Sequence, residues 1–207
     1  MKTQKGALEI LNVVLLTGLM LGVVTAVFIW GEPLIRKNEG VSVLHNSEIF
    51  ISDLAGGIKN LVNHPGRMTV DVPPSPSPQI KTLMMFDAAS KRLLLEVSGT
   101  SGTIYSPGGF ILLGRNACTA DEGISNQDEP QTLCARSEKV GENYITTYSL
   151  KFIQLNTEGV QSYRIDLTGN SNTVGEGHVI ILENKGTKTE LIDGKEVLKT
   201  KISVEMR

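Results

Sequence analysis

An uncharged and strongly apolar run near the start of the chain, Ile10 to Gly31, constrains the fold more than any other feature. Roughly 22 residues rising ~1.5 Å each form a helix of about 33 Å, enough to span a hydrocarbon core of about 30 Å. Secretory signal peptides have a shorter apolar core of about 7–15 residues that ends in small residues, whereas this run ends in bulky Val27-Phe-Ile-Trp-Gly31. A buried core helix of a soluble domain rarely lacks charge over this length. We therefore predict a membrane-spanning helix.

Basic residues flank the apolar run on both sides. Lys2, Lys5 and the amino terminus favour a cytoplasmic start, while Arg36 and Lys37 follow the span. Because the segment before the run is too short to be a domain, the remaining chain must lie across the membrane. We expect this head domain outside the cell.

The composition of the chain limits its partners. The chain has 207 residues with a net charge of −2, and about 170 residues after the run suffice for one domain with its own core. Near-neutral charge argues against nucleic acid as a partner, because nucleic-acid surfaces need a basic patch.

Two cysteines lie in the part expected outside. Cys118 and Cys134 do not match the spacing of a zinc pair, and no second Cys or His pair accompanies them. Outside the cell they are expected to form a disulfide, whereas in a reducing compartment they would be two buried thiols.

The segment after the run predicts first a helix and then strands. Phe50, Leu54, Ile58 and Leu61 recur at helical spacing, and His64-Pro65-Gly66 ends the pattern. Beyond it, short alternating segments are separated by turn residues. The predicted strands are Met68–Val72, Thr82–Phe86, Arg92–Val97, Gly102–Tyr105, Gly109–Leu113, Tyr144–Leu155, Gln161–Leu167, His178–Glu183, Lys188–Ile192 and Val197–Met206.

Turns and loops complete the prediction. Asp87–Lys91 and Asn184-Lys-Gly186 read as turns, Pro73–Pro78 as an extended connector, Thr168–Thr173 as a polar turn, and Asn116–Lys139 as a polar loop. The fold class is therefore α+β, with a long N-terminal hydrophobic helix followed by an antiparallel, β-sandwich-like head.

The leader Gln4-Lys-Gly-Ala-Leu-Glu-Ile-Leu11, running into an apolar helix, resembles that of archaeal type IV pilin precursors with a class III, prepilin-type signal sequence. In that family a prepilin-type peptidase removes a short basic leader on the cytoplasmic side. The retained helix then packs into the core of a filament beneath a β-rich head. The resemblance implies a leader of residues 1–6, a transmembrane and filament-core helix of residues 7–35, an amphipathic helical extension of residues 36–66, and a head of residues 67–207.

The resemblance also assigns residues to processing and assembly. It places the cut between Gly6 and Ala7 and makes Glu9 the acidic residue near the new terminus. After that cut Glu9 is the third mature residue, whereas the family pattern has its glutamate at the fifth. Glu9 thus marks the cytoplasmic edge of the membrane or a contact with a neighbouring subunit, or else it is an ordinary interfacial glutamate. Gly18 and Gly22 form a small-x-x-x-small face on which helices approach closely.

No motif of a known catalytic site is present. The chain lacks a Gly-x-Ser-x-Gly elbow, a His-Glu-x-x-His pair and a phosphate-binding loop, and His45, His64 and His178 are far apart in sequence. Asp121-Glu122 and Asp128-Glu129 fit no calcium-loop spacing and are interpreted as a solvated acidic loop. We expect no enzymatic activity, no cofactor and no metal site.

The expected function is that of a structural or minor subunit of an archaeal type IV pilus-like surface filament, acting in assembly and adhesion. Its partners would be the membrane, the peptidase and further copies of the same chain. The alternative is an uncleaved, single-span protein whose β domain binds cell-surface or S-layer components.

Overall fold

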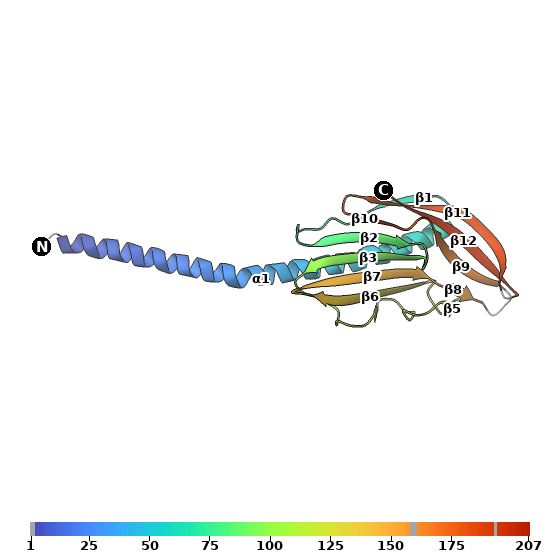
Figure 1. The fold of residues 1–207 in the computed structure, drawn as a ribbon, viewed down its shortest axis with the longest axis horizontal. Helices are drawn as coiled ribbons and strands as arrows, with labels where there is room; N and C mark the ends of the chain where they lie inside the picture. The colour runs from blue at the N-terminus through green and yellow to red at the C-terminus, as the bar shows by residue number, and fades with distance from the viewer. Residues whose placement is uncertain (1–2, 158–160, 193) are drawn as a thin grey trace. The chain divides into compact units, whose positions relative to one another are not determined.

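The computed structural model describes the backbone of residues 3–157, 161–192 and 194–207, and the side chains from residue 12 onward with the same gaps. One helix precedes a series of strands (Figure 1). In chain order the elements are α1 (Thr3–Asn63), β1 (Arg67–Asp71), β2 (Lys81–Asp87), β3 (Arg92–Thr100), β4 (Ile111–Leu112), β5 (Glu122–Ile124), β6 (Gln131–Val140), β7 (Asn143–Phe152), β8 (Gln154–Asn156), β9 (Gln161–Thr168), β10 (Asn172–Gly175), β11 (Val179–Ile192) and β12 (Lys195–Met206).

The chain divides into two compact units, here called the N-terminal unit (Met1–Asn38) and the head (Glu39–Arg207). Helix α1 contributes to both, because it continues through Pro33 without a break. Proline inside a helix removes one backbone hydrogen bond and favours a kink, yet the chain is helical on both sides of Pro33. The apolar segment and its amphipathic extension are therefore one helix, which ends at Asn63 just before the predicted stop.

Within the head, the second part of α1 buries the apolar stripe predicted from its spacing. Leu54, Ile58 and Leu61 are buried, and Phe50 and Val62 pack against the same core. At ~1.5–3 kcal/mol for each fully buried aliphatic side chain, this stripe stabilises the packing of the helix against the core of the head.

The described strands of the head form two six-stranded sheets. The first sheet has the order β1-β11-β12-β9-β8-β5, and the second has the order β10-β2-β3-β7-β6-β4. Their inner faces share one core with α1, to which Leu95 and Leu150 contribute from the second sheet and Ile180 and Ile202 from the first. In Figure 1 the second part of α1 runs behind strands β3 and β7. The α+β class is confirmed.

The prediction of an antiparallel head is only partly correct. Strands β12 and β9 pair in parallel, with Leu198 opposite Tyr163, and the short strands β5 and β8 also pair in parallel. The first sheet is therefore mixed, whereas the second is antiparallel in all its described pairs.

Several predicted local elements differ from the structure. Gly102–Tyr105 forms no strand, and the sequence Asn184-Lys-Gly186 does not turn the chain but forms an irregularity inside the long strand β11. The predicted loop Asn116–Lys139 contains the short strand β5 and most of β6, a ten-residue strand that lies between β7 and the edge strand β4 of the second sheet. The polar segment Thr168–Thr173 includes the start of β10.

Candidate functional site

The surface of the N-terminal unit is uncharged and largely apolar from residue 12 to residue 31, and the exposed ion pair between Glu32 and Arg36 follows this stretch. Exposed fractions of its large apolar side chains run from 52% for Val24 to 80% for Trp30. The members of this exposed set are Val13, Val14, Leu15, Leu16, Leu19, Met20, Leu21, Val23, Val24, Val27, Phe28, Ile29, Trp30, Leu34 and Ile35. A continuous apolar surface of this kind marks a site for lipid or for other protein chains.

The hydroxyl groups in this apolar segment find partners within the helix itself. Thr17 Oγ1 donates a 2.7 Å hydrogen bond to the carbonyl oxygen of Val13, and Thr25 Oγ1 donates one of the same length to Leu21. In hydrocarbon a polar group without such a partner is costly. Both threonines are thus compatible with a lipid environment.

The residues assigned to helix packing lie on the same open surface. A Cβ atom added at Gly18 or Gly22 would meet nothing within 4 Å, so a second helix can approach this face closely. Gly6 and Ala7 lie within α1. The side chains of Ala7 and Glu9 fall outside the described residues.

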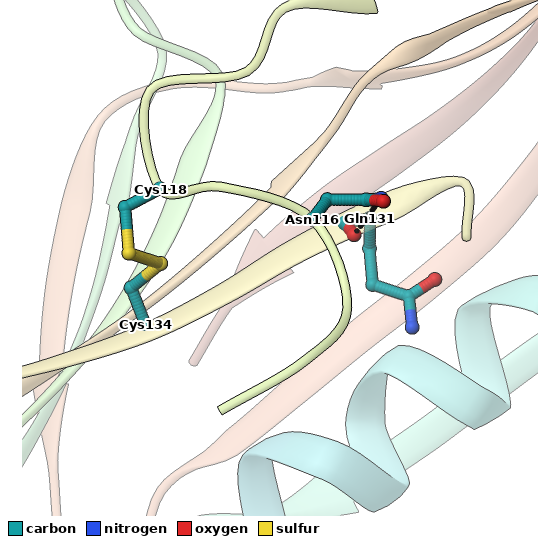
Figure 2. The surroundings of a disulfide bond; sticks show 4 residues. All are labelled: Asn116, Cys118, Gln131 and Cys134. Carbon is teal, nitrogen blue, oxygen red and sulfur yellow. Dashed lines mark hydrogen bonds between the residues drawn. A yellow bond between two sulfur atoms is a disulfide. The ribbon is translucent and has the colours of Figure 1, made fainter. Parts of the chain in front are cut away.

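The cysteine prediction is confirmed by the structure. Cys118 and Cys134 form a disulfide with a Cα–Cα distance of 5.9 Å, which joins the loop before β5 to strand β6 (Figure 2). Asn116 secures the same loop, because its side-chain Nδ2 donates to the backbone oxygens of Glu129, at 2.5 Å, and Gln131, at 2.9 Å. The loop is thus held to β6 at two points.

The acidic residues of this loop face different partners. Asp121 pairs with Lys151, whose hydrogen bond and charge lower the pKa of that carboxyl group. Glu122 accepts a hydrogen bond from the side chain of Asn156, and Asp128 accepts one from the backbone N–H of Ile124. Among the described residues, no three His, Cys, Asp or Glu side chains are placed to share a metal ion.

An aromatic pair connects α1 to the second sheet. The Tyr105 hydroxyl donates a 2.8 Å hydrogen bond to Glu48 of α1, and the rings of Tyr105 and Tyr148 meet edge to face with centroids 5.9 Å apart. Burial is the main cause that raises the pKa of both phenols above the ordinary range. The arrangement positions a loop against the helix, and both phenols remain protonated at neutral pH.

The outer face of the second sheet carries two adjoining hollows of about 310 and 630 Å³. Arg92, Phe110 and Ser149 line both of them. The sequence analysis missed this feature. Its residues come mainly from strands β3, β7 and β6 and from the segments before β4 and β5, which are brought together by the order of strands in the sheet.

The histidines considered at the sequence level are not brought together. His45 and His64 are exposed on α1 and just after it, and His178 is exposed before β11, where its Nδ1 lies 3.1 Å from the backbone oxygen of Glu176. Among the described residues, none of these histidines belongs to a group of three or more side chains that could hold a metal ion.

The fold and its surfaces define a class: an α+β protein with a long apolar N-terminal helix and a disulfide-bonded, β-rich head. By length and composition, α1 is the one helix in the described part of the chain that can cross a membrane. A signal sequence near the amino terminus would meet the same criteria of length and composition. Comparison with known protein families, curated proteins and solved structures gave no match.

Proposed function

We propose that this protein is a structural or minor subunit of an archaeal type IV pilus-like surface filament, with its head serving adhesion. One observation carries the proposal: α1 exposes its large apolar side chains from Val13 to Ile35, whereas from Val43 onward it buries apolar side chains in the head. A single chain leaves the first part uncovered in water. Lipid covers it before assembly, and neighbouring copies cover it in a filament.

The energetics favour such an exchange of lipid for protein. Burying several leucine-sized side chains against neighbouring subunits contributes ~1.5–3 kcal/mol for each relative to water. In lipid the gain comes instead from close packing between helices, for which Gly18 and Gly22 provide an unobstructed face. The same helix therefore serves as a membrane anchor first and as a filament core afterwards.

The disulfide supports a head outside the cell. Disulfides form and persist in oxidising compartments and are rare in the cytosol, and the Cys118–Cys134 bond lies within the head. Lys2 and Lys5 before the apolar segment favour the same orientation, with the amino terminus in the cytoplasm.

Leader processing is the experiment that tests the filament proposal. The native protein is purified from its own cells, and its intact mass and N-terminal sequence are measured. We expect the chain to begin at Ala7, because the resemblance places the cut after Gly6. Mature chains that still begin at Met1 or Thr3 would overturn the proposal and favour the uncleaved, single-span alternative.

A substitution at the assigned cut gives a second readout. Gly6→Trp places a bulky ring where the peptidase must bind, so we expect full-length chains to accumulate and filaments to be lost in electron micrographs. Gly66→Trp is the control, because it makes the same change at an exposed position after α1. Normal filaments built from Gly6→Trp chains would show that the cut is assigned wrongly.

A further inference from the structure

The hairpin of β11 and β12 continues beyond the strand that covers its edge. β1 pairs with β11 over residues 179–183, and next to this pairing the N–H of Asn184 donates a 3.0 Å bond to the backbone oxygen of Gly66. The register of β11 against β12 shifts between Asn184 and Thr187, and the two strands then run on together to their shared tip (Figure 1). In the described part of the chain no other strand pairs with this side of β11. We call Lys185–Ile192 the free edge.

Alternate backbone groups of the free edge point away from β12. Ile192 lies opposite Lys195, and these two residues close the hairpin across a two-residue connection. Such a closing pair exchanges hydrogen bonds, and bonded and non-bonded pairs alternate along antiparallel strands. Thr187, Thr189 and Leu191 therefore occupy non-bonded positions, and their N–H and C=O groups point to the open side. All three residues are exposed.

The charges on the free edge restrict which strand can pair with it. An open row of backbone donors and acceptors is a template for a further strand, and lysine on the edge is a common way to prevent this. Lys185 is paired with Glu183 at 2.7 Å. Lys188 is exposed and lies opposite Lys199, and it forms no ion pair among the described residues. An incoming strand must therefore place a carboxylate, and not a cation, opposite Lys188.

We propose that the free edges of two copies of this chain pair antiparallel across a two-fold axis at Thr189 and join the two heads through one continuous sheet. In this register Lys188 of each copy lies opposite Glu190 of the other, and Leu191 lies opposite Thr187. The two Thr189 residues face each other and exchange their outward-pointing N–H and C=O groups. Shifting the axis by one residue would place Lys188 opposite Lys188 or Glu190 opposite Glu190, and like charges directly opposite each other are destabilising.

A second copy fits the free edge better with its own free edge than with any other edge of its described sheets. The other edge strands are short: β1 has five residues, β10 four, β5 three and β4 two. The free edge is longer than each of them, and its sequence Lys188-Thr-Glu190 is complementary to itself when reversed. A contact between identical patches is closed, so it joins heads in pairs.

The pairing goes beyond the filament proposal and does not depend on it. Packing of apolar helices in a filament repeats from copy to copy, whereas this contact is closed and uses the heads alone. Leader removal is not required. A contact of this size holds two free copies only weakly, but chains anchored in one membrane would keep their heads at a high effective concentration.

Disulfide cross-linking of the full chain in detergent micelles tests the pairing. Thr189→Cys places one thiol on each side of the proposed axis, where opposite Cα atoms lie ~5.5 Å apart, within the ~4.4–6.8 Å that a disulfide spans. Leu191→Cys is the matched control: Leu191 is 74% exposed on the same strand, but four residues, roughly 13 Å, separate it from its counterpart. Under mild oxidation Thr189→Cys should form dimers about tenfold faster or more than Leu191→Cys. The native cysteines are already joined and do not compete.

A charge exchange tests the register independently. In the Thr189→Cys background, Lys188→Glu places two carboxylates opposite each other on both sides of the axis, and dimer formation should slow severalfold. Adding Glu190→Lys restores opposite charges and should restore the rate. Lys81→Glu is the control, because it makes the same charge change at an exposed position in β2 of the second sheet, and it should leave the rate unchanged.

Three outcomes would overturn the pairing. Equal cross-linking of Thr189→Cys and Leu191→Cys would show that the apolar helices alone bring copies together in the micelle. The absence of Thr189→Cys dimers, or no recovery of the rate in the charge-exchange variant, would exclude the proposed register. Each of these results is obtained with uncleaved chains, so the filament proposal is decided separately by the N-terminal sequence of the native protein.

Discussion

The phenol hydroxyl of Tyr148, in β7, donates a 2.6 Å hydrogen bond to the backbone carbonyl oxygen of Leu44, in α1. Both residues are fully buried. From the other sheet, the side-chain Nδ2 of Asn184 donates a 2.8 Å bond to the carbonyl oxygen of Leu61, near the end of the helix. Polar contacts therefore fix the second part of α1 to both sheets near its two ends, in addition to the apolar packing.

Removing the Tyr148 hydroxyl tests the first of these contacts. Tyr148→Phe keeps the ring and deletes the donor, so the free energy of unfolding should fall by about 1–2 kcal/mol. Urea unfolding followed by circular dichroism measures the difference. Tyr163→Phe is the matched control, because this phenol is 45% exposed. An equal loss in both variants would show that the bond to Leu44 contributes nothing specific.

The tyrosine pair predicts a loss of stability in alkali. Burial raises the pKa of Tyr105 and of Tyr148 in the folded head, whereas both phenols titrate near pH ~10 when unfolded. Their contribution is fully present below that pH and is lost as the pH rises above it, because only the unfolded chain releases these protons readily. We expect Tyr105→Phe to show a shallower fall in the free energy of unfolding between about pH 9 and about pH 11. Parallel slopes for wild type and variant would contradict this.

The sequence predicted best what depends on local periodicity. The stripe of Leu54, Ile58 and Leu61 follows helical spacing, and the structure buries it. Strand β6 escaped prediction because its inner face is partly polar: Gln131 and Ser137 are buried there, and Ser137 Oγ lies 2.6 Å from Thr146 Oγ1. The partner of Ser137 lies on another strand, which a single segment does not reveal, whereas the Gln131 amide donates to Glu129 just before the strand and its Oε1 is buried without a partner.

Tertiary contacts also reversed one clear turn signal. Asn184 and Gly186 together favour a turn, but the structure uses them inside β11. The Asn184 side chain donates to Leu61 in α1 and accepts a 2.7 Å bond from the Gly186 N–H. A long-range partner thus retains the two residues within the strand. The two hollows beside Arg92 on the outer face of the second sheet were not predicted from the sequence either, because β3 and β7 are neighbours in the sheet but not in the sequence.

The disulfide should contribute strongly to the stability of the head. It closes a loop across a sequence separation of 16 residues, for which the chain-entropy model gives roughly 3 kcal/mol. The double variant Cys118→Ser/Cys134→Ser should therefore unfold at lower urea concentration than the oxidised wild type. A reducing agent should lower the wild-type midpoint toward that of the variant and leave the variant itself unaffected. If the reducing agent had no effect on the wild type, the bond would not be a stabilising feature in solution.

Gly99 should tolerate no side chain. It lies in β3 where the register with β7 shifts between Ser98 and Thr100, and its φ is +87°. A Cβ atom there would come within 2.1 Å of the backbone oxygen of Gln79. Gly99→Ala thus adds a clash with backbone to the cost of a left-handed conformation, and we expect a loss of roughly 3 kcal/mol or more in the free energy of unfolding.

Gly141→Ala separates these two costs. Gly141 has a φ of +65° but open space around its added Cβ, so its substitution should cost only about 1–2 kcal/mol from the backbone conformation. Urea unfolding of both variants gives the comparison, and the excess loss in Gly99→Ala measures the clash with Gln79. Equal losses would mean that the connector before β2 moves aside, and that the close contact between Gly99 and Gln79 does not restrict this position.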